Sequence, residues 1–288
     1  MFKNNHFSLL FQYFFSIKKL SNIFCFFLYC KKPKWFVNIL KRYFIKFYNI
    51  SILESTKTDI SSYSSINDIF TRKINLKFRP IPKEPKTLIS PAEGTIVNIG
   101  NINEKKINIK GINFCILNLL GNSWEEINKF KNSIFVNIYL SPRDYHRVHM
   151  PYKGYLLKMT VIPGRLFSVS NKTVKKKPNL LSKNARISFL FHTKYGKLAL
   201  VLIGSILVSS IKIHHQKKIQ LSNIQKIKTY IYTTPIFFSK GEEIGYFNFG
   251  STVVLAIPNS TSIILNKKLK KNSFIQINSS IGKAKNIF

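Results

Sequence analysis

Hydrophobic and polar positions divide the chain into an aromatic N-terminal part with helical periodicity and a longer body of short apolar runs. In the N-terminal part, apolar residues recur every three or four positions, which predicts an amphipathic helix. Its apolar face consists of Phe36, Ile39, Leu40, Tyr43, Phe44 and Phe47, and its polar face of Asn38, Lys41, Arg42 and Lys46. An aromatic face opposite a basic face favours binding at a membrane interface. Packing of the apolar face against the protein's own body is the alternative, and the two can coexist.

No apolar run in the first 50 residues reaches the length that a bilayer requires. A spanning helix needs about 20 apolar residues, and runs such as Ile23–Cys30 are far shorter. Phe7–Ile17 is followed by two lysines and not by a small-residue cleavage site, which argues against a signal peptide. We therefore expect a membrane-associating helical segment over residues 1–60 and one domain over residues 61–288.

From Ser90 onward, short apolar runs are separated by Gly, Pro and Asn, a pattern typical of β-strands. Strands are predicted at Ile134–Leu140, Gly154–Ile162, Ala185–His192, Lys197–Ile213 and Gly245–Ile257, with weaker candidates at Thr95–Ile99 and Ile107–Ile109. Turn dipeptides favour antiparallel connections, at Pro163-Gly164, Tyr195-Gly196 and Lys240-Gly241. One short helix is expected near Ser65–Arg72. The predicted fold class is α+β, with N-terminal amphipathic helices followed by a mainly antiparallel β core.

The net charge favours anionic partners but does not distinguish nucleic acid from anionic lipid. The chain has 46 Lys+Arg against 11 Asp+Glu, a formal charge of +35, which attracts nucleic acid or anionic lipid. Much of this charge is also what an AT-rich coding sequence produces, because such a sequence over-supplies Lys, Asn, Ile and Phe. The lysines are scattered and form no recognisable basic motif. A nucleic-acid-binding protein therefore stays an alternative, and we expect no nucleic-acid partner.

The cysteines and histidines predict neither a disulfide framework nor a metal site. Cys25, Cys30 and Cys115 are odd in number and lack zinc spacing, so reduced thiols are the simplest interpretation. His214 and His215 are adjacent and would point to opposite sides of a strand, so a surface role is favoured over a ligand pair.

Three segments contain groups that could carry chemistry. Ser90–Thr95 has a carboxylate, Glu93, in a tight turn; Ser141–Pro151 has two imidazoles, His146 and His149; and Gly245–Thr252 has a Gly-Ser-Thr step inside a predicted β-hairpin. Each segment alone has a structural explanation as a turn, a polar loop or a bulge. Together they supply the carboxylate, imidazole and hydroxyl of an activated nucleophile.

The Gly250–Ser251 junction is suited to self-cleavage. Glycine has no Cβ, so the Ser251 hydroxyl can approach the Gly250 carbonyl with little hindrance. A strained peptide there can undergo an N-to-O acyl shift once a base removes the hydroxyl proton. β-Elimination then cuts the chain and leaves dehydroalanine, which hydrolyses to a pyruvoyl group.

These motifs, in this order and spacing, resemble the bacterial family of phosphatidylserine decarboxylase proenzymes. The resemblance covers about Ser62 to Pro258 and is most specific in the runs YHRVHMP and KGEEIGYFNFGSTVV. It extends to YSSINDIFTR, SPAEGT, PGRLFSVSN and IGSILVSSIK.

The resemblance implies a site and a cofactor. The cut would fall between Gly250 and Ser251, giving chains of residues 1–250 and 251–288, and Ser251 would become a pyruvoyl cofactor that forms a Schiff base with the substrate. Glu93, His149 and Ser251 would be the autocatalytic triad, and His146 would act in decarboxylation. No metal is implied. Arg143, Arg147 or nearby lysines are candidates, on charge alone, to hold the phosphate or carboxylate of the substrate.

The implied reaction converts phosphatidylserine to phosphatidylethanolamine and CO2. The implied partners are phosphatidylserine and an anionic membrane surface, with the two cleaved chains as a heterodimer and a homodimer of these, peripheral on the cytoplasmic face of the inner membrane. Decarboxylation of another amino-headgroup lipid or of a soluble amino acid is the closest alternative, and a decayed enzyme that keeps the fold is a further one.

Three residues depart from the family pattern. Glu93 replaces the usual Asp, which adds roughly 1.5 Å of reach, so slower maturation or local compensation is expected. Ser209 replaces a Gly, and His192 stands where Asp is common.

Overall fold

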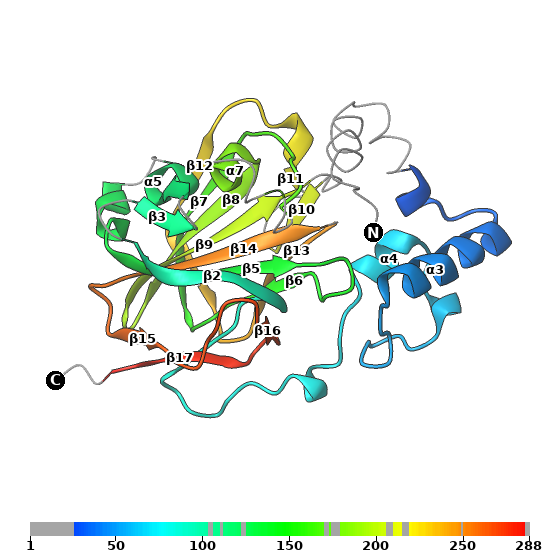
Figure 1. Cartoon of the computed structure of the whole chain (residues 1–288), viewed down its shortest axis with the longest axis horizontal. Helices are drawn as coiled ribbons and strands as arrows, with labels where there is room; N and C mark the ends of the chain where they lie inside the picture. The colour runs from blue at the N-terminus through cyan, green and yellow to red at the C-terminus, as the bar shows by residue number, and fades with distance from the viewer. Residues whose placement is uncertain are drawn as a thin grey trace, which may run out of the picture.

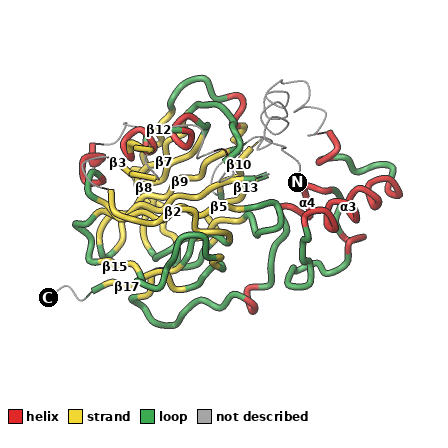
Figure 2. Tube along the Cα trace, viewed as in Figure 1, coloured by secondary structure: helices red, strands yellow, loops and turns green. Residues whose placement is uncertain are grey.

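The computed structural model describes residues 26–102, 106–109, 112–121, 125–169, 173, 179–205, 210–214, 219–248 and 250–285. Helices α3 and α4 lie on the N-terminal side, while strands and two short helices, α5 and α7, form the body (Figures 1 and 2), which confirms the predicted α+β class. Phe7–Ile17, Cys25, Ser209 and His215 lie outside the described residues.

The helices are α3 (Lys34–Tyr48), α4 (Ile66–Phe70), α5 (Ile116–Leu120) and α7 (Leu180–Lys183), with 3-10 turns at Ile60–Ser62, Leu76–Phe78, Glu125–Phe130 and Leu221–Asn223. The strands are β1 (Thr87–Ile89), β2 (Gly94–Ile102), β3 (Lys106–Ile109), β4 (Ile112–Cys115), β5 (Ser133–Leu140), β6 (Arg147–His149), β7 (Gly154–Ile162), β8 (Arg186–Thr193), β9 (Gly196–Gly204), β10 (Ser210–Ile213), β11 (Ile219–Gln220), β12 (Lys228–Phe238), β13 (Glu243–Phe247), β14 (Ser251–Pro258), β15 (Ile263–Leu265), β16 (Phe274–Ile275) and β17 (Ser280–Ala284).

An eight-stranded antiparallel sheet forms the centre of the body, in the order β12-β7-β8-β9-β14-β5-β2-β16. Strand β14 lies between β9 and β5, and every one of its residues is buried. That burial on both faces explains its continuous apolar sequence. The predicted turn at Tyr195-Gly196 joins β8 to β9, and Gly196 adopts a positive φ of 116° that glycine accommodates easily.

A second, four-stranded sheet has the order β11-β10-β13-β6 and corrects two predictions. Gly245–Ile257 is not one strand, and its Gly-Ser-Thr step is not inside a hairpin, because β13 and β14 belong to different sheets. Lys197–Ile213 divides in the same way into β9 and β10. Both strands of each pair are largely buried, so the hydrophobic pattern continues through a change of sheet and does not reveal it.

Helix α3 forms where an amphipathic helix was predicted, but its buried face differs. Val37, Lys41 and Phe44 are buried, although Lys41 was expected on the polar face. The Lys41 Nζ donates to the carbonyls of Ile60 at 2.8 Å and Tyr63 at 2.5 Å, so its ammonium is satisfied by the next turn of chain. No helix in the described part of the chain is long and apolar enough to cross a membrane.

The remaining apolar face of α3 is exposed. Trp35, Ile39, Tyr43 and Phe47 follow one another at four-residue spacing and are 57–66% exposed. They form a stripe, called the aromatic stripe below, along the solvent side of the helix.

Sequence patterns did not predict strand β12 or the three-stranded sheet β1-β17-β15. Strand β12 is an edge strand with mostly exposed positions, and its register shifts between Ile231 and Ile236, around Pro235. Such an edge lacks the apolar alternation of a half-buried strand, and proline is tolerated there.

Candidate active site

The Gly250–Ser251 junction lies where the chain enters the central sheet from the second sheet. Ser251 opens β14 and pairs with Leu140 on one side and Gly204 on the other. Its side chain is fully buried, and its Oγ has no hydrogen-bond partner among the described residues. A buried unpaired hydroxyl costs about 1–3 kcal/mol, so it is a feature that calls for a functional explanation.

The chain just before the junction is held by polar contacts of Asn248. Asn248 donates through Nδ2 to Ser210 Oγ at 2.7 Å and through its backbone N–H to the Ser210 carbonyl at 3.1 Å. Asn67 of α4 donates to the Asn248 side-chain carbonyl at 3.3 Å. No atom of the described chain lies within 4 Å of the point where a Cβ on Gly250 would be, so packing does not require glycine there.

His146 is a fully buried neutral imidazole at this end of β14. Its Nδ1 lies 2.9 Å from the Asp144 carbonyl, so Nδ1 carries the proton and Nε2 has the free lone pair. Nε2 has no hydrogen bond of normal geometry among the described residues. Burial lowers the pKa of His146 to about 3, against the opposing effect of the Asp144 and Leu140 carbonyls.

Neighbouring elements fix the His146 ring close to the junction. The ring centroid of Phe70, from α4, lies 3.8 Å from that of His146, and Phe247 N–H donates to the His146 carbonyl at 3.1 Å. Leu140, which affects the His146 imidazole, is also the cross-strand partner of Ser251. The two unpaired polar atoms, His146 Nε2 and Ser251 Oγ, therefore belong to the same end of the sheet.

His149 is buried with both ring nitrogens engaged. Its Nδ1 donates to the Gly241 carbonyl at 2.8 Å, and its Nε2 accepts from the Tyr145 hydroxyl at 3.1 Å. Burial lowers the pKa of His149, so the neutral form is favoured. In this arrangement, the Nε2 lone pair faces Tyr145 and not Ser251.

Glu93 is held by an arginine that sequence analysis missed. Arg79 donates to its two carboxylate oxygens at 2.7 Å and 3.3 Å, and the same guanidinium pairs with Glu54 at 2.7 Å. The backbone of His149 donates to the Pro91 carbonyl at 2.8 Å, so the segments of Glu93 and His149 are neighbours. Glu93 has no hydrogen bond to His149 among the described residues, and the triad stays a prediction.

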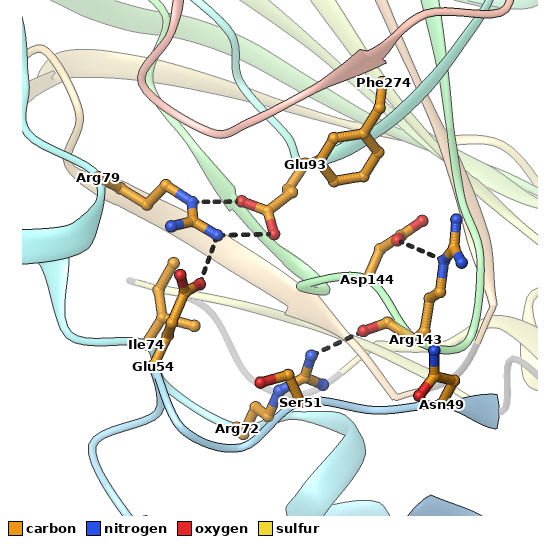
Figure 3. Close-up of a pocket in the computed structure, with 10 residues that line it drawn as sticks. All are labelled: Asn49, Ser51, Glu54, Arg72, Ile74, Arg79, Glu93, Arg143, Asp144 and Phe274. Carbon is orange, nitrogen blue, oxygen red and sulfur yellow. Dashed lines mark hydrogen bonds and ion pairs between the residues drawn. The ribbon is translucent and has the colours of Figure 1, made fainter. Parts of the chain in front are cut away.

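A cavity of about 290 Å³ lies beside Glu93 (Figure 3). Its lining is mostly polar and charged: Asn49, Ser51, Glu54, Arg72, Ile74, Arg79, Glu93, Arg143, Asp144 and Phe274. Ser251, His146 and His149 are not part of this lining. One sequence signal could have pointed here, because arginine is scarce beside lysine in this chain and three arginines meet at the cavity.

The two arginines named as anion-binding candidates differ. Arg147 is buried, pairs with Glu243 at 2.7 Å and donates to the Thr71 carbonyl at 2.7 Å and 3.0 Å. Its guanidinium is therefore already bonded within the protein. Arg143 has a side chain that is 59% exposed, and it approaches Asp144 only to 3.7 Å. Arg143 is therefore the available cation of the two.

The structure also places two further histidines that the sequence analysis named, His192 and His214. His192 is exposed on β8, opposite Tyr155 and Lys197. His214 Nε2 lies 2.8 Å from Glu243, which also pairs with Arg147, so His214 has a carboxylate partner at a partly exposed position.

Comparison with known proteins gives one consistent result. A family model for phosphatidylserine decarboxylase matches residues 66–283. Phosphatidylserine decarboxylase proenzymes of Salmonella arizonae and Salmonella agona are each 37% identical over 241 residues, covering 81% of this chain and 75% of theirs. The matched region contains Glu93, both histidines and the Gly250–Ser251 junction. The chain belongs to the phosphatidylserine decarboxylase family.

Proposed function

We propose that this chain is a proenzyme that cleaves itself between Gly250 and Ser251 and then decarboxylates phosphatidylserine to phosphatidylethanolamine and CO2. The observation that carries the proposal is the buried, unpaired Ser251 Oγ at the start of β14, in a chain of this family. A hydroxyl without a partner keeps its lone pairs and its proton free for reaction.

The cleavage is a rearrangement within the backbone. Ser251 Oγ attacks the Gly250 carbonyl carbon while its proton passes to a base, and the C–N bond breaks to give an ester and a free amine at residue 251. Loss of the Cα proton of residue 251 then expels the Gly250 carboxylate and leaves dehydroalanine. Water converts this group to pyruvoyl and ammonia.

The proposed triad assigns His149 as the base and Glu93 as the group that orients it. In that assignment, His149 Nε2 must leave Tyr145, and Glu93 must leave Arg79, before Ser251 is deprotonated. Slower maturation stays the expectation for Glu93, because its pairing with Arg79 would have to be released first.

The pyruvoyl group, once formed, supplies an electrophilic carbonyl that binds the substrate amine and accepts electrons as CO2 leaves. His146 is proposed to hold or move a proton at Nε2 in this step, since burial lowers its pKa and keeps it neutral near pH 7, and Nε2 has no hydrogen bond of normal geometry among the described residues.

The two product chains are expected to stay together. Strand β14 of the smaller chain pairs with β5 and β9 of the larger chain along its length. Strands β16 and β17 pair in addition with β2 and β1. The proposal of a heterodimer follows from this interleaving, and that of a homodimer from the family resemblance alone.

Peripheral membrane binding is proposed through α3. Trp35, Ile39, Tyr43 and Phe47 present aromatic and aliphatic surface to solvent, while Arg42 and Lys46 beside them are exposed and basic. This combination suits an anionic interface. The cytoplasmic face of the inner membrane is the proposed location.

Intact mass spectrometry of the denatured protein tests the proposal. We expect two chains separated after Gly250, with a blocked N-terminus on the smaller one, and a single full-length chain for Ser251→Ala. Release of CO2 from phosphatidylserine micelles should accompany cleavage. A wild-type chain that stays full-length under maturation conditions would contradict the proposal, and turnover of free amino acids alone would exclude the lipid substrate.

A further inference from the structure

The charged cavity lies between the helical N-terminal segment and the body. Asn49 and Ser51, which directly follow α3, line one side, and Glu93 and Asp144 from the body line another (Figure 3). The cavity thus joins the end of the helix with the exposed aromatic stripe to the loop that carries His146.

Charges in the cavity are unevenly distributed. On one side, a single guanidinium, Arg79, faces two carboxylates, Glu54 and Glu93. On the other side lie two guanidiniums, Arg72 and Arg143, and one carboxylate, Asp144, whose Oδ1 is 3.7 Å from Arg143 Nε. The Asp144 carboxylate also accepts hydrogen bonds from Ser141, from its backbone N–H at 2.7 Å and its hydroxyl at 2.8 Å. The second side therefore has one more cation than anion, although the Glu93 and Asp144 carboxylates both act on Arg72.

Arg72 is the less satisfied of these two arginines. It is 7% exposed, and its Nη2 donates to the Arg143 carbonyl at 2.7 Å. Its Nη1 reaches the Ile69 carbonyl only at 3.5 Å, and its buried Nε has no partner among the described residues. A buried guanidinium with incomplete hydrogen bonding is costly unless an anion completes its shell.

We propose that this side of the cavity binds the phosphodiester of a phospholipid headgroup, with Arg143 and Arg72 as its cationic partners; the inference rests on the proposed function and extends it to the substrate's phosphate. Guanidinium groups match phosphate oxygens in geometry and charge. Arg143 supplies an exposed guanidinium, and Arg72 supplies a buried one in the wall of the cavity.

Position favours a lipid headgroup over free phosphate. The cavity begins at the C-terminal end of α3, whose aromatic stripe is suited to the membrane interface. Its far wall is Asp144, three residues after Ser141, and Ser141 follows Leu140, the cross-strand partner of Ser251. A headgroup whose phosphate lies at Arg143 is thereby held between the bilayer and the end of β14.

The first test measures binding without catalysis. In the uncleaved full-length Ser251→Ala protein, titration of glycerophosphoserine followed by NMR should give saturable binding, and adding Arg143→Gln should weaken it by at least about tenfold. Lys267→Gln removes one exposed positive charge outside the cavity and is the matched control, with affinity unchanged. Equal affinity in the Arg143 and Lys267 variants, no binding by the parent, or binding of inorganic phosphate alone would each overturn the assignment.

The second test uses the mature enzyme. Arg143→Gln should raise KM for phosphatidylserine by about tenfold or more. The kcat of each variant is normalised to its pyruvoyl content. Arg143→Lys should bring KM part of the way back to the wild-type value. A fall in normalised kcat with unchanged KM would contradict a phosphate-binding role. Failure of the proposed function is distinguishable, because then the wild type itself would neither cleave nor release CO2.

Discussion

The start of β14 and the turn before β2 contain the predicted catalytic groups in opposite states. At the start of β14, Ser251 Oγ and His146 Nε2 are buried and have no partner among the described residues. At the turn, Glu93 is paired with Arg79, and in the neighbouring strand β6 His149 has hydrogen bonds at both nitrogens. The first region is poised with unpaired groups, whereas the second is stabilised by contacts that must break before its groups can act as a triad.

Within one candidate site, the unpaired groups are available for reaction, whereas the paired groups stabilise the fold. Buried polar atoms without a hydrogen bond lower the free energy of unfolding. Hydrogen-bonded ones must first break their bonds before the side chains can move into a triad. If the triad assignment is correct, the slow part of maturation is the release of Glu93 and His149, and not the exposure of Ser251. Variants of each region test this division.

Replacing each of the two histidines in turn with alanine has the largest expected effect. His149→Ala should slow self-cleavage by about 10²–10⁴-fold, the range for loss of a general base, while His146→Ala should cleave and then fail to release CO2. Time courses of chain cleavage and of CO2 release separate the two. Added imidazole should restore part of the cleavage in His149→Ala, which a merely misfolded variant would not show. The reverse pattern would make the histidine with the unpaired nitrogen the base for cleavage.

The arginine clamp on Glu93 has the next largest expected effect. Arg79→Gln leaves Glu93 and Glu54 without their shared cation, and we expect a loss of about 3–5 kcal/mol in the free energy of unfolding. Glu93→Gln should cost less, because Arg79 keeps Glu54 as a partner. Urea unfolding of both variants in the Ser251→Ala background measures this, and equal small losses would show that the pairing contributes little.

Much of this architecture could be predicted from sequence, and its failures have physical reasons. The strands Ile134–Leu140 and Gly154–Ile162 follow directly from apolar runs between turn residues. The division of Gly245–Ile257 could not be predicted, because buried strands of two sheets share one continuous hydrophobic pattern. Burial of Lys41 could not be predicted either, since it depends on carbonyls of a turn that lies about twenty residues away.

The candidate active site could likewise be predicted only in part from the sequence. Motifs single out Glu93, His146, His149 and Ser251 as candidates because the proposed chemistry depends on residue type. Arg79 was missed because its role depends on folding next to Glu93 and Glu54, neither of which is its sequence neighbour. Partners of catalytic groups are properties of the tertiary fold, and local sequence does not specify them.

Acid pH should weaken the fold through the buried histidines. Burial lowers the pKa of His146 from 6.5 to about 3, so between these values the unfolded chain binds a proton that the folded chain refuses. The stabilisation is complete above pH 6.5 and falls by about 1.4 kcal/mol per pH unit as the pH drops through that window. Urea unfolding of Ser251→Ala between pH 7.5 and 4.5 should show this slope, and His146→Asn should reduce it. An unchanged slope in the variant would mean that other groups dominate.

Tyr145→Phe has the smallest expected effect and tests the comparison most directly. It removes the hydroxyl that occupies His149 Nε2 and leaves the ring, so the imidazole lone pair is released with little change in packing. A buried hydrogen bond of this kind contributes about 0.5–1.5 kcal/mol, which corresponds to a two- to roughly tenfold faster cleavage if its rupture precedes proton transfer. Tyr152→Phe, which removes a buried hydroxyl outside the triad, is the matched control. Slower cleavage in Tyr145→Phe would instead assign the tyrosine hydroxyl a direct part in the proton transfer from Ser251, and the paired region would then be the reactive one.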